Sequence, residues 1–305
     1  MDVYDDFEKQ LMEISGWKFI KSPNKYVQRI FQSLILPKLK QRQFNFNLPH
    51  VRSPKYLFAL LSGTEYSKIF LQYSFKAKLK VLYMFDPWTI LNQLNENALR
   101  SYKVNIAFIS AKQAVSYFNS INIPGFKAYW IPEAINSSLC KYSNYTEKNI
   151  DVIQYGRQWK WLHDKIEPFC NAQKINYSFQ TKFEPRNVIL DTIAKSKITV
   201  CVPRILTHPE QGTLSTLTWR YFECMSSKCL IWGKAPSELV ELFGYNPVIE
   251  IDMENPEKQL QELIANYSSY IPLIEKNYAL VIAKHQWNNR IDDMLEILNK
   301  KLLCE

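Results

Sequence analysis

The sequence has few glycines, 7 among 305 residues, and it lacks the short motifs that mark several large enzyme classes. Neither GxGxxG nor GxxxxGK[S/T] occurs, which excludes the common dinucleotide fingerprint and a P-loop NTPase. The motifs HExxH and GxSxG and the protein-kinase signature are absent as well. An enzyme built on this chain must therefore be recognised from its fold and from longer patterns.

Metal and disulfide chemistry is also poorly supported by the sequence. The six cysteines show no CxxC spacing, and three of them lie in apolar strand-like or helix-like stretches. They are typical of reduced thiols in a cytosolic protein and not of a disulfide framework or a zinc site. The four histidines are scattered, so each is expected to be structural. These residues are Cys140, Cys170, Cys201, Cys224, Cys229 and Cys304, and His50, His163, His208 and His285.

No apolar run approaches the ~18 residues of a membrane span. The first eight residues are acidic and lack the apolar core of a secretory signal, so none is expected. With 47% hydrophobic and 14% aromatic residues, the composition excludes a disordered chain. We expect a cytosolic protein, either free or attached to a membrane surface.

Positive charge is concentrated in the first half of the chain. Residues 1–150 carry 20 Lys and Arg against 10 Asp and Glu, whereas residues 151–305 carry 18 against 19. A basic half suggests an acidic partner, namely nucleic acid, an anionic membrane surface or a phosphorylated substrate. A solvated lysine-rich surface is the alternative.

Residues 3–45 are expected to be helical. Apolar residues recur there at helical spacing, and cations follow Pro37, so the stretch could lie on a membrane surface or pack against its own domain. The apolar residues are Tyr26, Ile30, Phe31, Leu34 and Ile35, and the cations are Lys38, Lys40 and Arg42.

From residue 55 onward, short apolar runs alternate with helix-like segments. This alternation predicts parallel sheets that are covered by helices on both faces. A polar stretch without periodicity, 136–149, interrupts the alternation and is the best linker candidate. The expected strands are 56–61, 80–85, 105–109 and 127–131, then 150–155, 175–179, 198–202, 228–232 and 248–251.

Because both halves repeat the same strand–helix pattern, we predict an α/β protein with two Rossmann-like domains that face each other across a cleft. The N-terminal domain is expected over 1–140 and the C-terminal domain over 141–305. The last helix is free to pack back on the first domain. Open α/β sheets bind ligands at the carboxyl ends of their strands.

The most informative segment is 198–233, in which a strand, a polar loop, a helix from near Leu217 and a short strand follow one another. Arg220 and Glu223 lie three residues apart on that helix and therefore share a face. An arginine at a helix N-terminus suits anionic phosphates, and a Glu one turn later could accept bonds from two ribose hydroxyls. A surface ion pair between the two side chains is the alternative.

Four segments of the chain resemble motifs of the group 1 glycosyltransferases, and in particular the CgeB-like subgroup. Residues 220–231 resemble that family's R-x-x-E helix and the strand after it, and 285–295 (HQWNNRIDDML) resemble its closing helix. Residues 150–157 (IDVIQYGR) and 129–134 (YWIPEA) resemble the strands on either side of its interdomain linker. The order and spacing of all four agree, over roughly residues 55–302.

The resemblance implies the GT-B fold, with an N-terminal, acceptor-side domain (1–140) and a C-terminal, nucleotide-sugar-binding domain (141–305). It also implies a nucleotide-linked sugar as donor, without a metal ion or other cofactor. Arg220 is expected to bind the diphosphate, with Arg157 and Lys160 as helpers, and Glu223 the ribose; Gly156 lets backbone approach the ligand. Many retaining relatives carry a Glu eight residues before the helix Glu, where this chain has Ser215; Glu210 could replace it from the loop. The absence of Asp-x-Asp agrees with metal independence.

On the acceptor side, Asp86 follows an apolar strand and is the candidate base for an inverting reaction; an Asx cap before Pro87 is the alternative. Trp88 could stack on a sugar or belong to the core. Lys76, Lys78 and Lys80 alternate, so they would share one face of an extended stretch and could bind an anionic acceptor.

Taken together, these features predict a glycosyltransferase that moves a sugar from a nucleotide-diphosphate sugar, such as a UDP-sugar, to an anionic or membrane-associated glycan or lipid acceptor. Glycosylation of nucleic acid (DNA) and a non-catalytic GT-B scaffold that binds sugar nucleotides are the alternatives. The sequence leaves open the donor, the acceptor, the stereochemistry and the oligomeric state.

Overall fold

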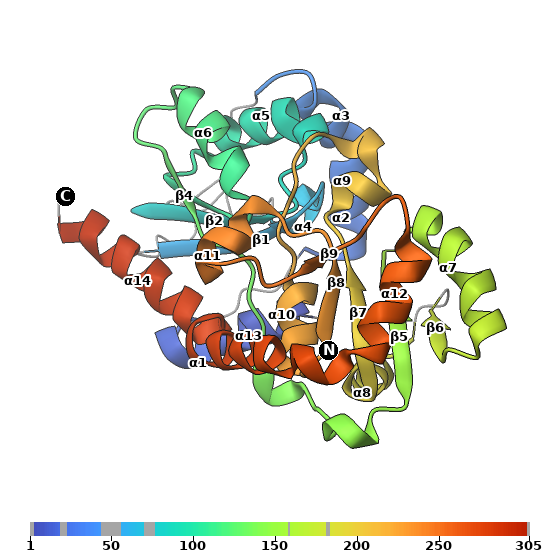
Figure 1. Cartoon of the computed structure of the whole chain (residues 1–305). Helices are drawn as coiled ribbons and strands as arrows, with labels where there is room; N and C mark the ends of the chain where they lie inside the picture. The colour runs from blue at the N-terminus through green and yellow to red at the C-terminus, as the bar shows by residue number, and fades with distance from the viewer. Residues whose placement is uncertain are drawn as a thin grey trace. The chain divides into compact units, whose positions relative to one another are not determined.

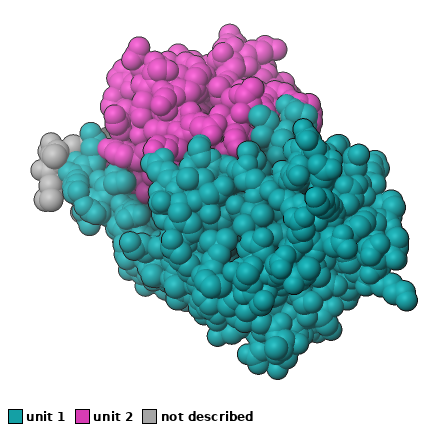
Figure 2. Space-filling model, in the orientation of Figure 1, with its two compact units in different colours: residues 1–16, 133–209, 217–305 teal, residues 17–132, 210–216 magenta. Residues whose placement is uncertain are grey.

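The structure is a computed structural model, which describes residues 3–18, 23–43, 56–69, 77–157, 159–180 and 184–303. The chain forms two compact units (Figure 2). Unit 1 comprises residues 1–16, 133–209 and 217–305, and unit 2 comprises 17–132 and 210–216. The chain therefore passes from one unit to the other four times.

Unit 2 contains a parallel sheet of four strands in the order β1-β2-β3-β4 (Figure 1). Tyr56 of β1 pairs with Leu79 of β2, and Val81 of β2 pairs with Ile106 of β3. Each strand lies where the sequence predicts one, to within one residue. The elements are β1 (Tyr56–Ser62), α4 (Tyr66–Ile69), β2 (Leu79–Phe85), α5 (Asn92–Tyr102), β3 (Ile106–Ile109), α6 (Lys112–Ser120) and β4 (Lys127–Trp130).

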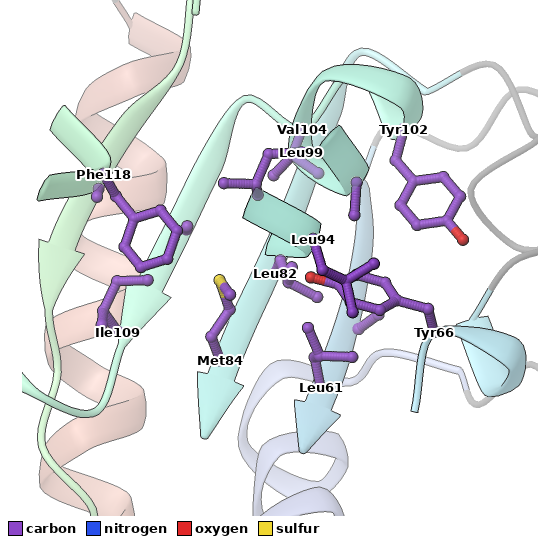
Figure 3. Close-up of a cluster of buried hydrophobic side chains, with 14 of the residues drawn as sticks. Leu61, Tyr66, Leu82, Met84, Leu94, Leu99, Tyr102, Val104, Ile109 and Phe118 are labelled. Atoms are coloured by element: carbon purple, nitrogen blue, oxygen red, sulfur yellow. The ribbon is translucent and has the colours of Figure 1, made fainter. Parts of the chain in front are cut away.

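The core of unit 2 lies between this sheet and its helices. Figure 3 shows Leu61, Leu82 and Met84 from the strands in one cluster with Leu94 and Leu99 from α5, and all are buried. Burial of side chains on both faces of β2 and β3 explains why these strands read as continuous apolar runs and not as alternating ones.

The N-terminal segment is helical but not continuous, which differs from the expectation for residues 3–45. Helix α1 (Val3–Ser15) ends at Gly16, whose φ of +68° favours glycine and stops the helix, and it belongs to unit 1. A second helix belongs to unit 2 and runs through α2 (Lys25–Ile30), a π-helical turn η1 (Phe31–Ile35) and α3 (Leu36–Leu39).

Unit 1 contains a parallel sheet of five strands in the order β6-β5-β7-β8-β9. With the sheet of unit 2, it confirms the prediction of two α/β domains with parallel sheets. The strands are β5 (Ile150–Gln154), β6 (Tyr177–Phe179), β7 (Ser196–Cys201), β8 (Leu230–Gly233) and β9 (Ile249–Glu250). The helices are α7 (Lys160–Gln173), α8 (Arg186–Ala194), α9 (Arg204–Thr207), α10 (Trp219–Ser226), α11 (Ser237–Phe243), α12 (Pro256–Ala265), α13 (Ile271–Lys284) and α14 (Trp287–Leu303).

Apolar side chains cover both faces of this sheet. On one face, Ile153 and Ile231 pack with residues of α10, α11 and α13. On the other face, Val152, Val200 and Trp232 pack with residues of α7 and α12. Since neighbouring strand residues point to opposite faces, this two-sided burial fixes the sheet between two helical layers.

The first and the last of the described helices pack together within unit 1. Helix α1 packs on α14, and the rings of Phe7 and Trp287 lie 4.8 Å apart. The expected linker, 136–149, carries two short 3-10 turns, η4 (Ser137–Leu139) and η5 (Tyr145–Glu147), the second closed by a capping box between Asn144 and Glu147. This stretch is therefore ordered even though it shows no sequence period.

Candidate active site

Cations gather where the strands of unit 1 end. Arg157 follows β5, Arg204 follows β7, Lys234 follows β8, and Arg220 is the second residue of α10. Because all the strands are parallel, their carboxyl ends lie along one edge of the sheet, where open α/β sheets bind ligands. The three arginines are partly exposed and Lys234 is exposed, so this edge presents positive charge to the solvent.

Arg220 is placed by the glycine turn that follows β5. Its guanidinium Nη1 donates a hydrogen bond to the carbonyl of Tyr155 at 3.3 Å. Gly156 has a φ of +70°, and a Cβ there would come within 3.0 Å of the same Nη1. A side chain at position 156 would therefore be strained and would push Arg220 away. The backbone therefore turns tightly at Gly156, next to Arg220, while the diphosphate-binding role of Arg220 stays a prediction.

The surroundings of Tyr221 indicate that the cations of this edge lie close to one another. Its hydroxyl donates to the carbonyl of Lys234 at 2.6 Å, which places it at the end of β8. Burial raises the pKa of Tyr221, while the charges of Arg220 and Arg157 act in the opposite direction. Both guanidinium groups therefore lie close enough to stabilise negative charge at that point, as they would stabilise a phosphate.

The N-terminus of α10 already holds a carboxylate. The buried Glu133 side chain accepts a hydrogen bond from the backbone N–H of Trp219 at 2.9 Å. The cap residue Thr218 makes no side-chain cap bond. Positive charge at this edge thus comes chiefly from arginine side chains and less from the helix end. The sequence analysis missed Glu133, although it stands in the quoted run YWIPEA, directly after Pro132.

Glu223 lies in a buried network. Only 3% of its surface is exposed, one oxygen accepts from the Tyr155 hydroxyl at 2.8 Å, and the other lies 3.1 Å from Arg186. Arg186 also lies 3.9 Å from the buried Asp6 of α1. Burial raises the pKa of Glu223, whereas the charge of Arg186 and the hydrogen bond from the Tyr155 hydroxyl partly lower it again. For Glu223 to bind ribose, a hydroxyl would have to replace one of these partners.

Glu223 and Arg220 do not form the surface ion pair that was the alternative interpretation. They leave α10 toward different partners, Arg220 toward the Gly156 turn and Glu223 toward Arg186. Tyr155 joins the two, because its carbonyl binds Arg220 and its hydroxyl binds Glu223. A single residue at the end of β5 therefore connects the buried network to the exposed cations.

The remaining predicted donor residues make other contacts. Lys160, at the start of α7, is exposed and pairs with Asp164 at 2.8 Å. The loop of 210–216, with Glu210 and Ser215, belongs to unit 2. There Gly212 packs so tightly that a Cβ would overlap Thr89, and Ser215 exchanges hydrogen bonds with Gln113 at 3.3 and 3.4 Å.

Asp86 and Trp88 lie at the carboxyl edge of the unit 2 sheet, as expected for residues that follow β2. Asp86 has a φ of +51°, a left-handed conformation that Asp adopts more readily than most residues. Within the described residues, its carboxylate has no hydrogen bond or ion pair, so the Asx cap is not formed. Trp88 is half-buried and packs beside Gly63, the residue after β1.

The three lysines predicted for the acceptor do not gather beside Asp86. Lys76 lies outside the described residues, and Lys78 and Lys80 lie at the opposite end of β2, about 20 Å away at ~3.3 Å per residue. Lys80 donates to the carbonyl of Tyr102 at 3.1 Å. Burial, together with the charge of Lys103, lowers its pKa to about 8. An acceptor that contacts both groups would have to span the sheet.

Neither a metal-binding cluster nor a membrane-spanning helix is found among the described residues. Across the described residues, no cluster of three or more His, Cys, Asp or Glu side chains could hold a metal ion. Among the helices that the structure describes, none combines the length and the apolar character that a membrane crossing requires.

Comparison with known proteins identifies the fold. No protein-family model and no curated protein sequence matches the chain. Among solved structures, sucrose-phosphate synthase from Thermosynechococcus elongatus is similar with a TM-score of 0.58 and 9% identity, covering 82% of this chain and 74% of the other. Anabaena HepE, solved in complex with UDP and glucose, has a TM-score of 0.57 and 10% identity, over 96% and 89%.

A third similar structure is a glycosyltransferase from Rickettsia africae, with a TM-score of 0.52 and 12% identity over 96% of this chain and 87% of the other. At these identities the likeness establishes the fold. The chain has the GT-B fold of the glycosyltransferases, with two Rossmann-like α/β domains, which confirms the fold predicted from the sequence. The finer assignment to the CgeB-like subgroup stays a prediction.

Proposed function

We propose that the protein is a glycosyltransferase that transfers a sugar from a nucleotide-diphosphate sugar, most simply a UDP-sugar, to an anionic or membrane-associated glycan or lipid acceptor. The GT-B fold supports the reaction class, and HepE, which shares the fold, was solved with UDP and glucose. The observation that carries the proposal is the position of Arg220 over the Gly156 turn, beside Arg157.

The cations at the carboxyl edge of the unit 1 sheet suit the departing diphosphate. As the reaction proceeds, the bond between the anomeric carbon and the β-phosphate oxygen breaks, and its electron pair leaves with the nucleotide. Guanidinium groups that are already fixed in place stabilise that charge without reorganising. Arg220 is fixed by the Tyr155 carbonyl, and Arg157 and Arg204 supply further charge, whereas Lys234 is paired with Glu250. This arrangement requires no metal ion.

The new bond forms between the anomeric carbon and an acceptor hydroxyl, whose proton must be taken up. In an inverting reaction we propose Asp86 as the base, because its carboxylate has no partner within the described residues and a strained backbone holds it at the end of β2. Trp88, two residues later, is proposed to stack on the acceptor sugar.

The test is nucleotide binding by the full chain, measured by thermal shift and calorimetry with UDP and GDP. A nucleotide at ~100 times its Kd should add about 2.7 kcal/mol of stability. Arg220→Ala should weaken binding roughly 10- to 150-fold, because a hydrogen bond to a charged group contributes about 1.5–3 kcal/mol. Lys258→Ala removes an exposed cation of α12 that pairs with Glu262, and it is the matched control.

A chelator should leave this binding unchanged. Donor turnover with a panel of UDP-sugars then separates an enzyme from a binding scaffold. If neither nucleoside diphosphate binds, or if Arg220→Ala and Lys258→Ala bind UDP equally well, the proposed donor site is wrong.

A further inference from the structure

The helix of residues 25–39 in unit 2 is anchored by one row of its side chains. Val27, Phe31, Ile35 and Leu39 recur every four residues, and Phe31 and Leu39 are fully buried. Asn97 of α5 donates to the carbonyl of Leu39 at 2.9 Å and fixes the end of the helix. The inner row therefore holds the helix on the unit without help from its outer face.

The outer face carries a second apolar row, which is exposed. Tyr26, Ile30 and Leu34 also recur every four residues, and 72%, 38% and 61% of their surfaces are exposed. At the π-helical turn of 31–35, the N–H of Leu36 bonds to the carbonyl of Phe31. This turn widens the helix, so that residues four positions apart stay on the same face. Ten large hydrophobic side chains are exposed among the described residues, and three belong to this one row.

Cations border this row, and the flanking sequence contains no acidic residue. Lys25 and Arg29 precede Tyr26 and Ile30, Lys38 continues the row, and all three are exposed. Residues 14–64 contain nine Lys and Arg and no Asp or Glu. Unit 2 as a whole has 17 Lys and Arg against 4 Asp and Glu, whereas unit 1 has 21 against 25. The charge contrast between the units is thus sharper than that between the sequence halves.

From the exposed row of Tyr26, Ile30 and Leu34 and the cations that border it, we infer that this helix face binds the surface of a bilayer containing anionic lipids. A helix lying in the interface buries its apolar row at the acyl boundary and holds its cations level with the lipid phosphates. Tyr26 fits that level because its ring is apolar and its hydroxyl polar. A nucleic acid would satisfy the cations but would leave the apolar row in water.

This inference rests on the helix face and does not depend on the proposed glycosyl transfer, so either can fail alone. The experiment is flotation of the full chain with vesicles of phosphatidylcholine, with and without phosphatidylglycerol, at low and physiological salt. We expect flotation only with the anionic vesicles. Salt should weaken it, because exposed charges are screened over ~8–10 Å.

Two paired variants test the two components of the face. Tyr26→Ser with Leu34→Ser should lower partitioning by roughly tenfold or more, through the lost apolar area. Arg29→Glu with Lys38→Glu should lower it by at least about 25-fold, since each cation near an anionic surface contributes about fivefold. Met253→Ser and Lys258→Glu alter exposed residues of unit 1 and should float like the wild type. All four substituted positions of the face are exposed, so melting temperatures should not change.

Several results would overturn the inference. One is flotation that both paired variants leave intact, and another is equal flotation with neutral vesicles. If only the charge variant lowers flotation, and duplex DNA of equal total charge competes with the vesicles for the protein, the partner is a nucleic acid. If the wild type is a dimer in sedimentation and the serine variant a monomer, a second copy of the chain covers the face.

Discussion

Replacing Glu223 with glutamine removes one negative charge from the buried network of unit 1 and keeps the size of the side chain. In the wild type, Arg186 lies 3.1 Å from Glu223 and 3.9 Å from Asp6. After the substitution, the Arg186 guanidinium keeps only the longer of these ion pairs. We therefore expect Glu223→Gln to destabilise the folded protein strongly, whatever its effect on catalysis.

The expected size follows from burial. Removing one partner of a buried ion pair costs about 3–5 kcal/mol, because the other charge is left uncompensated. Arg186 is still 19% exposed and keeps its contact with Asp6, so its charge is left only partly uncompensated and the lower value, about 3 kcal/mol, applies. For a unit of this size, that corresponds to a Tm lower by roughly 6–12 °C. Glu262→Gln, which breaks the exposed contact of α12 with Lys258, should change Tm by less than about 2 °C.

The same variant separates two roles for Glu223. Melting curves give its contribution to stability, and calorimetry with UDP below the lowered Tm gives its contribution to binding. If Glu223 holds α10 and Tyr155 in place, Tm falls and the UDP affinity of the folded protein changes little. If Glu223 binds the ribose, as the sequence predicts, affinity falls roughly 10- to 150-fold.

A double-mutant cycle with Arg186→Met measures the coupling directly. Because Arg186→Met removes the charge that Glu223 balances, adding Glu223→Gln to it should cost much less than Glu223→Gln alone. If the effects of the two substitutions on unfolding free energy simply add, or if Glu223→Gln melts with the wild type, the ion pair does not stabilise the fold and the reasoning is refuted.

Two further predictions concern backbone strain and acid stability. Lys228 has a φ of +51°, contacts the rings of Tyr142 and Tyr278 and pairs with Glu275. In urea unfolding, the unfolding free energy of Lys228→Gly should stay within about 1 kcal/mol of the wild type, since relief of the left-handed strain offsets the lost contacts. Lys228→Ala should lower it by about 1–2 kcal/mol. Burial, with the charges of Arg290 and Lys284, lowers the pKa of His285 to about 3. Below pH 6.5 the unfolded chain therefore binds a proton that the folded chain does not bind, so stability should fall by about 1.6 kcal/mol between pH 6.5 and 5. His285→Gln should remove most of that pH dependence.

The fold was predictable because parallel strands that are buried on both faces read as apolar runs. All nine predicted strands exist. The prediction was incomplete for the first 45 residues, where the hydrophobic periodicity indicates helix but does not show that the helix is interrupted. Gly16 ends α1, and the chain changes units at that point. Helical spacing carries no information about which unit a helix packs on.

The candidate site was predicted in part. The Gly156 turn and Arg220 were found from a motif, and the structure places them together. Tyr155, Arg186 and Glu133 were missed, because their roles depend on contacts between residues far apart in sequence. Lys78 and Lys80 were predicted on charge alone to bind the acceptor, and the length of β2 separates them from Asp86, the predicted base.

Positive charge has a different distribution in each unit, and this indicates two different roles. Unit 1 has more acidic than basic residues, yet Arg157, Arg204, Arg220 and Lys234 gather at one edge of its sheet. Charge that is local and held by hydrogen bonds suits a small ligand with a fixed shape, such as a diphosphate. In unit 2 the cations are spread over exposed positions with few acidic neighbours, which suits a broad anionic surface at which no single contact has to be exact. A substitution at the first set should therefore change affinity for one ligand, whereas neutralisation of the second should act gradually and depend on salt.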